Sequence, residues 1–384
     1  MAVDSFRLRS LVLTLIILSG AAWAAPGRVF KHPDPGASLT ARWDWAFRTA
    51  KEGAFADGFW AGYSIRRKMS ENSFIGSWNW PPKADDWTLD RILSGRGRPA
   101  ADPEADERNI KEAARKALDE IDGRTRPESI VDKDIAILLR FRPSSGSVPL
   151  EIEICDVQSL FDPKGAPLFW LGPAGDSDSM AALERFYSGP AGLEAKKDLI
   201  QAAGLHQAPG VALPFLERAA ATSSPEAFRR EATAALGDQP VPRAVEVLRR
   251  LIGEDRSVEV RKAAVEALAS SSVPAALDVL IETAGKSPDE AVREAALEGL
   301  AEKASERAVA ALSRAAFNDK ETEVQRAAVA VLAELPQGKA LPALANVART
   351  HANPEVKKAA IEALAEIGGP EVIAVLAELA RTKK

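Results

Sequence analysis

The sequence predicts a fold in two parts: an α+β domain, then an all-α solenoid of about six helix pairs. One observation behind this is a pattern that closes in steps of 32 residues, on Leu236, Leu268, Leu300, Leu332 and Leu364. A second leucine series keeps the same step, at Leu216, Leu248, Leu280, Leu312, Leu344 and Leu376. In addition, every tryptophan of the chain precedes residue 190, so the two halves also differ in composition.

Each repeat is predicted to hold two helices. In the second repeat, Val260, Ala264 and Leu268 follow the three-to-four-residue spacing of one helix face. Leu280 belongs to the equivalent face of the partner helix. A capping residue followed by proline marks helix starts, as in Asn353-Pro354. Because one pair cannot bury its apolar face alone, the pairs are expected to stack.

The repeated motif carries a resemblance to a known family. Val260-Arg261-x-Ala-Ala-x-x-Ala-Leu and its copies resemble HEAT-like repeats, of the short kind named after phycobilisome lyases. The resemblance covers residues 191–384. It implies a curved superhelix whose inner helices form a binding surface, and it implies no single activity.

The first 24 residues are predicted to be an export signal. Arg7 and Arg9 precede the apolar run of residues 11–18, and Ala22 and Ala24 form an A-x-A cleavage site. The apolar run is shorter than the roughly 20 residues that span a bilayer, so cleavage near Ala24 is favoured over a retained anchor. We therefore expect export to the periplasm or the extracellular space, and no membrane span after cleavage.

Residues 25–190 are expected to form the α+β domain, and the resemblance does not extend to them. Apolar spacing and turn residues predict helices over residues 39–50, 104–121 and 177–187, and strands over residues 59–65, 73–80, 135–141, 150–157 and 168–171. The composition changes near Ser188-Gly189-Pro190. The predicted domains are therefore residues 1–24, 25–190 and 191–384.

The composition argues against most catalytic chemistries. The chain has one cysteine, Cys155, and three unpaired histidines, which disfavours metal centres, cofactor sites and nucleophilic triads. Glu151 and Glu153 alternate on a strand and could act as a general acid and base, but the solvated face of a half-buried strand is the favoured interpretation. A net charge of −5 disfavours nucleic acid as a partner.

Two groups of residues are candidates for partner binding. Arg243, Arg307 and Lys339 recur near the start of the second helix of the repeat and could hold an acidic segment, or could be plain solvated side chains. Trp78, Trp80 and Trp87 could stack on a sugar or pack on a partner, but they could equally form a domain core.

These features predict an exported, non-enzymatic scaffold or adaptor that binds a protein partner through the repeats. Two alternatives stay open at this stage. One is a lyase-like or hydrolytic accessory protein. The other is a carbohydrate- or peptidoglycan-binding module that uses the tryptophans.

Overall fold

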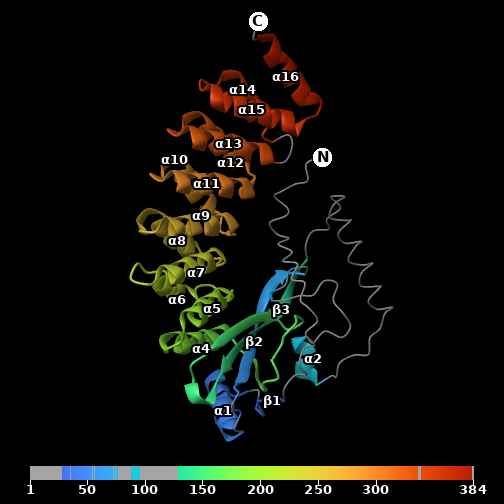
Figure 1. Cartoon of the computed structure of the whole chain (residues 1–384), viewed down its shortest axis with the longest axis vertical. Helices are drawn as coiled ribbons and strands as arrows, with labels where there is room; N and C mark the ends of the chain where they lie inside the picture. The colour runs from blue at the N-terminus through green and yellow to red at the C-terminus, as the bar shows by residue number, and fades with distance from the viewer. Residues whose placement is uncertain are drawn as a thin grey trace, which may run out of the picture. The chain divides into compact units, whose positions relative to one another are not determined.

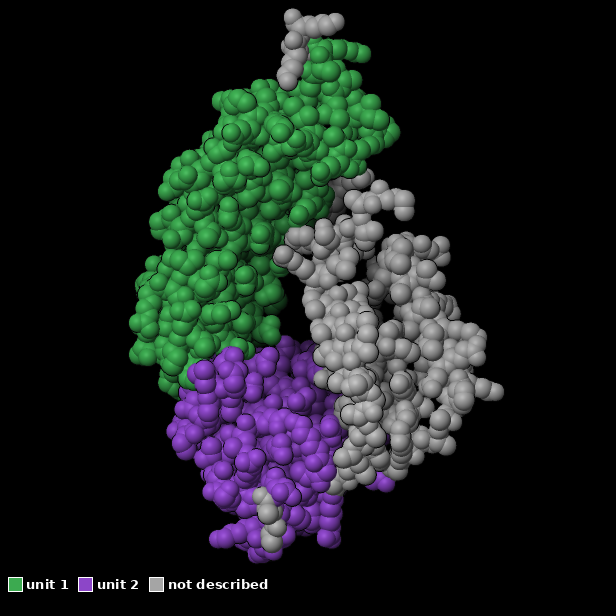
Figure 2. All heavy atoms as spheres, viewed as in Figure 1, with its two compact units in different colours: residues 1–19, 216–384 green, residues 20–215 purple. Residues whose placement is uncertain are grey.

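The computed structural model describes residues 28–382, apart from residues 35, 54, 56, 72, 74, 77–87, 96–128 and 336–338. The predicted signal, the predicted helix over residues 104–121, and Trp78, Trp80 and Trp87 lie outside the described residues. The contacts divide the described residues into two compact units, with the boundary between residues 215 and 216 (Figure 2).

A five-stranded mixed sheet organises the first unit, in the order β1-β5-β2-β3-β4 (Figure 1). The strands are β1 (Val29–Lys31), β2 (Phe59–Ser70), β3 (Ile130–Phe141), β4 (Glu151–Asp156) and β5 (Leu168–Pro173). β2, β3 and β4 pair antiparallel, whereas β5 pairs parallel with both β2 and β1. The short 3₁₀ turn Pro143–Ser145 lies between β3 and β4, where a hairpin is predicted.

The helices α1 (Leu39–Glu52) and α4 (Asp176–Ser188) pack on one face of this sheet. The indole of Trp43 is buried on α1 and meets the rings of Tyr63, Phe141 and Phe186 edge-on. Such aromatic pairs contribute beyond the area they bury. Trp43 therefore has a core role, and the predicted helices over residues 39–50 and 177–187 are confirmed.

On the opposite face of the sheet, Trp60 packs edge-on against Phe161, together with α2 (Leu89–Ser94). Cys155 belongs to the same apolar cluster and is fully buried. Burial raises the pKa of the Cys155 thiol, so the cysteine is a packed apolar residue rather than a nucleophile.

Helix α5 (Leu193–Gly204) belongs with the sheet unit rather than with the repeats that follow it. It packs on β4 and on α4. Just after it, the side chain of Gln207 exchanges two hydrogen bonds with the backbone of Lys68 on β2, at 2.7 and 3.0 Å. Residues 191–215, which the sequence assigns to the repeats, therefore group with the first unit by their contacts.

The second unit is a stack of helix pairs, as predicted. We call the first helix of each pair the A helix and the second the B helix. The A helices are α7 (Glu226–Gly237), α9 (Val258–Ser270), α11 (Glu290–Lys303), α13 (Thr322–Glu334) and α15 (Pro354–Ile367). The B helices of these pairs are α8 (Pro242–Glu254), α10 (Ala275–Lys286), α12 (Glu306–Asn318), α14 (Leu341–Thr350) and α16 (Pro370–Thr382). They are preceded by a further B helix, α6 (Leu213–Ala219), which spans the boundary between the two units.

Successive A helices contact one another, and successive B helices do the same from α8 to α16 (Figure 1). The leucines that recur in the sequence form the interior of the stack, with Leu236, Leu268, Leu300 and Leu332 all fully buried. Glycine at position 237 permits the close approach of α7 and α9, because a Cβ there would lie 2.8 Å from the carbonyl oxygen of Ala267. The repeat pattern therefore fixes both the helices and the faces by which they stack.

Buried ion pairs hold the repeats together on the A-helix side. Arg229 on α7 donates two hydrogen bonds to Asp255 in the next inter-helix loop, at 2.8 and 2.9 Å, and neither side chain is exposed. Burial alone would raise the pKa of Asp255, but its hydrogen bonds with Arg229 and the Ser257 amide lower it overall. Arg229 therefore bonds neighbouring turns of the stack.

The same arrangement recurs two repeats later. Arg293 on α11 donates to Asp319 at 2.8 and 2.9 Å. Between the two pairs, Arg261 donates to the backbone oxygen of Asp255 and pairs with Asp289 at 2.9 Å. We call this run of arginine contacts the arginine ladder; it ties three successive loops, at Asp255, Asp289 and Asp319, to the A helices α7, α9 and α11.

We expect Leu280→Ala to lower the free energy of unfolding of the repeat unit by about 2–5 kcal/mol, because Leu280 is fully buried in the stack. Far-UV circular dichroism, which follows the loss of helix during unfolding, measures this free energy. Tryptophan fluorescence should not change at the same transition, because every tryptophan of the chain precedes residue 190. The control Ile373→Ala removes a side chain that is 65% exposed and should cost no more than about 0.5 kcal/mol. Equal losses would contradict the assignment of Leu280 to the core.

We expect Asp255→Ala to cost about 3–5 kcal/mol, because it leaves the Arg229 guanidinium buried without its carboxylate. The matched control is Asp278→Ala, which removes the acid of the Arg307–Asp278 pair, whose side chains are 63% and 61% exposed. That change should cost about 0–1 kcal/mol. Chemical unfolding, monitored by circular dichroism, compares the free energy of unfolding of the two variants. A similar loss of stability in both would show that the ladder stabilises the repeats no more than surface pairs do.

Candidate functional site

The predicted basic residues lie at the starts of B helices, each bonded to the preceding repeat. Arg243 pairs with Glu217 at 2.9 Å and with Glu246 at 3.0 Å. Arg307 pairs with Asp278 on α10, and the ammonium of Lys339 donates to the carbonyl oxygen of Ala304 at 2.8 Å. These three side chains are exposed, so they lie on the surface of the stack while bridging its repeats. Their role in binding a partner stays a prediction.

Further ion pairs join the B helices across the same side of the unit. Arg249 on α8 pairs with Glu282 on α10 at 2.5 Å, and Arg349 on α14 pairs with Glu378 on α16 at 2.6 Å. Exposed pairs of this kind contribute little to stability. They do neutralise charge locally, so many cations of the B helices have an intramolecular counter-ion.

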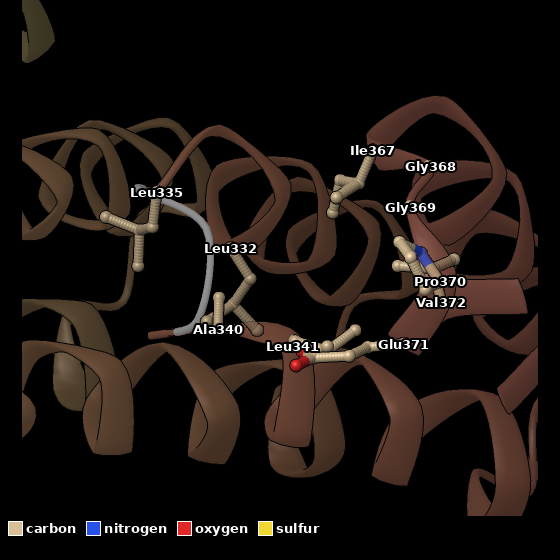
Figure 3. A pocket seen from close by; sticks show the side chains of 10 residues that line it. All are labelled: Leu332, Leu335, Ala340, Leu341, Ile367, Gly368, Gly369, Pro370, Glu371 and Val372. Carbon is tan, nitrogen blue, oxygen red and sulfur yellow. The ribbon is translucent and has the colours of Figure 1, made fainter. Parts of the chain in front are cut away.

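A pocket of about 330 Å³ opens near the last two repeats (Figure 3). It lies between residues at the end of α13 and the start of α14 on one side and the turn that joins α15 to α16 on the other. Its walls are predominantly apolar, with one carboxylate, that of Glu371; the lining residues are Leu332, Leu335, Ala340, Leu341, Ile367, Gly368, Gly369, Pro370, Glu371 and Val372. No sequence signal marks this pocket, because it forms only where two repeats meet.

The paired carboxylates of β4 have different surroundings. Glu151 bonds to Lys164 at 2.7 Å and to Arg140 at 3.2 Å; these bonds lower its pKa although burial alone would raise it. Burial raises the pKa of Glu153, and the charge of Glu151 raises it further. Two carboxyls with diverging pKa values are the pattern of a general acid and base. However, both oxygens of Glu151 are engaged by cations, as in a structural surface pair.

A buried polar chain links β2, α4 and the segment after α5. The Tyr63 hydroxyl and the His206 Nε2 each lie 2.8 Å from the Ser179 Oγ, and all three residues are buried. The His206 Nδ1 lies 3.0 Å from the carbonyl oxygen of Ala203, so Nδ1 carries the proton and Nε2 accepts from Ser179. The Ser179 hydroxyl then accepts a hydrogen bond from the Tyr63 hydroxyl, so these three hydrogen bonds form with the His206 imidazole neutral. This serine–histidine contact is inaccessible, which excludes it as a nucleophile and base in this conformation.

Among the residues that the structure describes, no group of three or more His, Cys, Asp or Glu side chains is placed to hold a metal ion. Within the same residues, no helix has the length and apolar character needed to cross a bilayer.

The second unit is thus an α-solenoid of stacked helix pairs. The sequence profile of the family described as HEAT repeats matches residues 212–301 and 309–384. This part of the chain consists of HEAT repeats, as the resemblance of its motif predicts. No curated protein matches the sequence.

Several solved structures are similar to the chain. The Escherichia coli protein YibA is 19% identical, over 53% of this chain and 76% of that one, with a TM-score of 0.34. Human deoxyhypusine hydroxylase is 22% identical over 53% of this chain and 78% of its own, with a TM-score of 0.25. The complex of CpcE and CpcF of phycocyanin lyase from Nostoc is 20% identical over 49% of this chain and 96% of that one, with a TM-score of 0.23. At this level of similarity they carry no argument about activity.

The polar chain at His206 makes the stability of the first unit depend on pH. Burial lowers the pKa of His206 below its ordinary value, because the buried imidazole is held neutral. The unfolded state therefore binds the proton first. The stabilisation is fully present above the unfolded pKa of about 6.5 and is lost as the pH falls through the lower folded value.

We expect the free energy of unfolding of the first unit to fall between pH 7 and pH 5 by at most about 1.4 kcal/mol per pH unit from this group. The variant His206→Gln should show a flatter profile. Tryptophan fluorescence during urea unfolding reports the unit selectively, since all tryptophans precede residue 190. The control His351→Gln alters a histidine of the repeats and should leave the profile unchanged. Parallel profiles for wild type and His206→Gln would show that this histidine does not titrate as described.

Proposed function

We propose that the protein is an exported, non-enzymatic scaffold that binds a protein partner along its HEAT repeats. The observation that carries the proposal is the repeat stack itself. HEAT solenoids are typical of protein-interaction scaffolds, because stacked helix pairs offer one long surface built from equivalent positions.

The distribution of charge and burial supports this proposal. The arginine ladder holds successive repeats through buried contacts, whereas the contacts between repeats on the B-helix side are exposed and contribute little to stability. The first unit also lacks an assembled reaction centre in its described residues: Cys155 and Ser179 are buried, and Glu151 is engaged by Lys164 and Arg140. A binding role is therefore favoured over a lyase-like or hydrolytic one.

Export is part of the proposal and is supported by the sequence of residues 1–24, with its basic start, short apolar run and A-x-A site. Binding of carbohydrate would depend on Trp78, Trp80 and Trp87, which lie outside the described residues. That alternative stays a prediction from the sequence.

Co-purification of the full-length tagged protein from cross-linked cell envelopes tests the proposal. We expect one protein to be enriched at least tenfold over an untagged control. The double variant Arg307→Glu, Lys339→Glu should reduce that enrichment at least fivefold if the basic column contributes to binding.

The matched control is Arg250→Glu with Arg314→Glu, which makes the same change of charge at other exposed positions of the B helices α8 and α12. It should retain the partner. Recovery of no protein above background by the wild type would contradict a scaffold role.

A further inference from the structure

The pocket between the last two repeats combines apolar walls with an unmatched carboxylate. Leu341 at the start of α14 and Ile367 at the end of α15 are half-exposed lining residues, and Glu371 lies beside Leu341 (Figure 3). A volume of about 330 Å³ is at the small end of the range for ligand pockets, roughly 300–1,000 Å³. The side chains that line it belong to the second unit alone.

The position of Glu371 explains why its carboxylate faces this pocket. It occupies the repeat position held by Arg243, Arg307 and Lys339 in earlier repeats, so the sign of the charge is reversed. Arg307 pairs with Asp278 on the preceding B helix, 29 residues earlier in the sequence. The residue 29 positions before Glu371 is Pro342, which offers no polar side chain. Within the described part of the chain, no hydrogen bond or ion pair of the Glu371 carboxylate is found.

A second acidic residue is adjacent to the lining in the sequence. Glu366 directly precedes the lining residue Ile367 and is exposed near the end of α15. An acidic side chain at a helix C-terminus is disfavoured by the helix dipole, so its placement there is not explained by helix stability. The ammonium of Lys339, which precedes the lining residue Ala340, donates to the Ala304 carbonyl at 2.8 Å.

We propose that this pocket takes an apolar side chain of the protein partner, one flanked by lysine or arginine in the partner's own sequence. The apolar walls would desolvate the side chain, and the carboxylate of Glu371, with Glu366 next to the lining residue Ile367, would complement the flanking cations. This inference rests on the proposed scaffold function and names the chemistry of the segment that the scaffold binds.

Fluorescence anisotropy with labelled peptides tests the inference on the full-length protein. The probe peptide carries one leucine between two pairs of lysines. One comparison peptide has alanine in place of leucine, and another has glutamates in place of the lysines. We expect the probe to bind at least tenfold more tightly than either comparison peptide, because each lacks one of the two features that the pocket recognises.

Two variants connect that binding to the pocket. Glu371→Lys reverses the charge at an exposed position and should weaken the probe at least tenfold, whereas Ile367→Trp should weaken it by filling the opening. Glu306→Gln is the matched control, because Glu306 is an exposed acid in the first turn of another B helix, α12. It should leave binding unchanged. Circular dichroism verifies folding, and Glu371→Gln, which keeps the side-chain size, should itself weaken binding at least threefold.

Three outcomes would overturn the inference. The probe does not bind at all, or Glu371→Lys and Ile367→Trp bind it as wild type does. Alternatively, sedimentation shows that these variants abolish a dimer without changing peptide binding, which would make a second copy of the chain the occupant. Each outcome leaves the scaffold proposal separately testable, because that proposal fails only if co-purification recovers no partner.

Discussion

A helix pair in this protein has apolar residues on the sides that face both neighbouring pairs, and it can bury them only when a pair lies on each side. The fully buried leucines of the A and B helices fulfil this condition by stacking in two parallel rows. Stacking brings each loop between repeats against the A helix that precedes it, and that proximity makes the buried Arg229–Asp255 contact possible. The ladder is therefore a result of the stacking as well as a contribution to it, and the pocket between the last repeats depends on the same packing.

The solenoid has two kinds of ion pair, buried pairs on the A-helix side and exposed pairs on the B-helix side. On the A-helix side, Arg229 and Arg293 are buried and bidentate, so their desolvation is offset only by well-aligned carboxylates. On the B-helix side, the ion pairs are exposed and exchangeable with solvent or with a partner. A binding partner could compete for the second group without unfolding the repeats. At Glu371 the exposed series changes sign, which separates this end of the unit chemically from the repeats before it.

The sequence was sufficient for the repeats and for part of the sheet. A 32-residue step with apolar residues three and four apart predicts helices and their buried faces. Apolar spacing and turn residues predict β2, β3 and β4, and the turn residues between β3 and β4 lie where these two strands pair. The parallel pairing of β5 and the three-residue β1 leave no local signal, because their partners are distant in sequence. Composition indicated a boundary near residue 190, whereas α5 packs on the sheet through contacts that composition does not encode. The basic column was visible as a pattern, but its bonds to Glu217, Asp278 and Ala304 and the pocket at Glu371 require neighbouring repeats to be in place.

The contacts of the arginine ladder alternate, because the same arginine–aspartate contact recurs after two repeats and not after one. Arg229 and Arg293 each meet an aspartate 26 residues further along, whereas the same offset from Arg261 leads to Ser287, and Arg261 turns to Asp289 instead. Removing the 32 residues from 237 to 268 would keep every helix boundary in phase, yet it would bring Arg229 opposite Ser287. Removing two adjacent repeats would bring it opposite Asp319, a carboxylate of the same kind. Between α7 and α12, loss of two adjacent repeats would therefore keep the bidentate arginine–aspartate pairing, whereas loss of one repeat would replace it by the Arg261 type of contact.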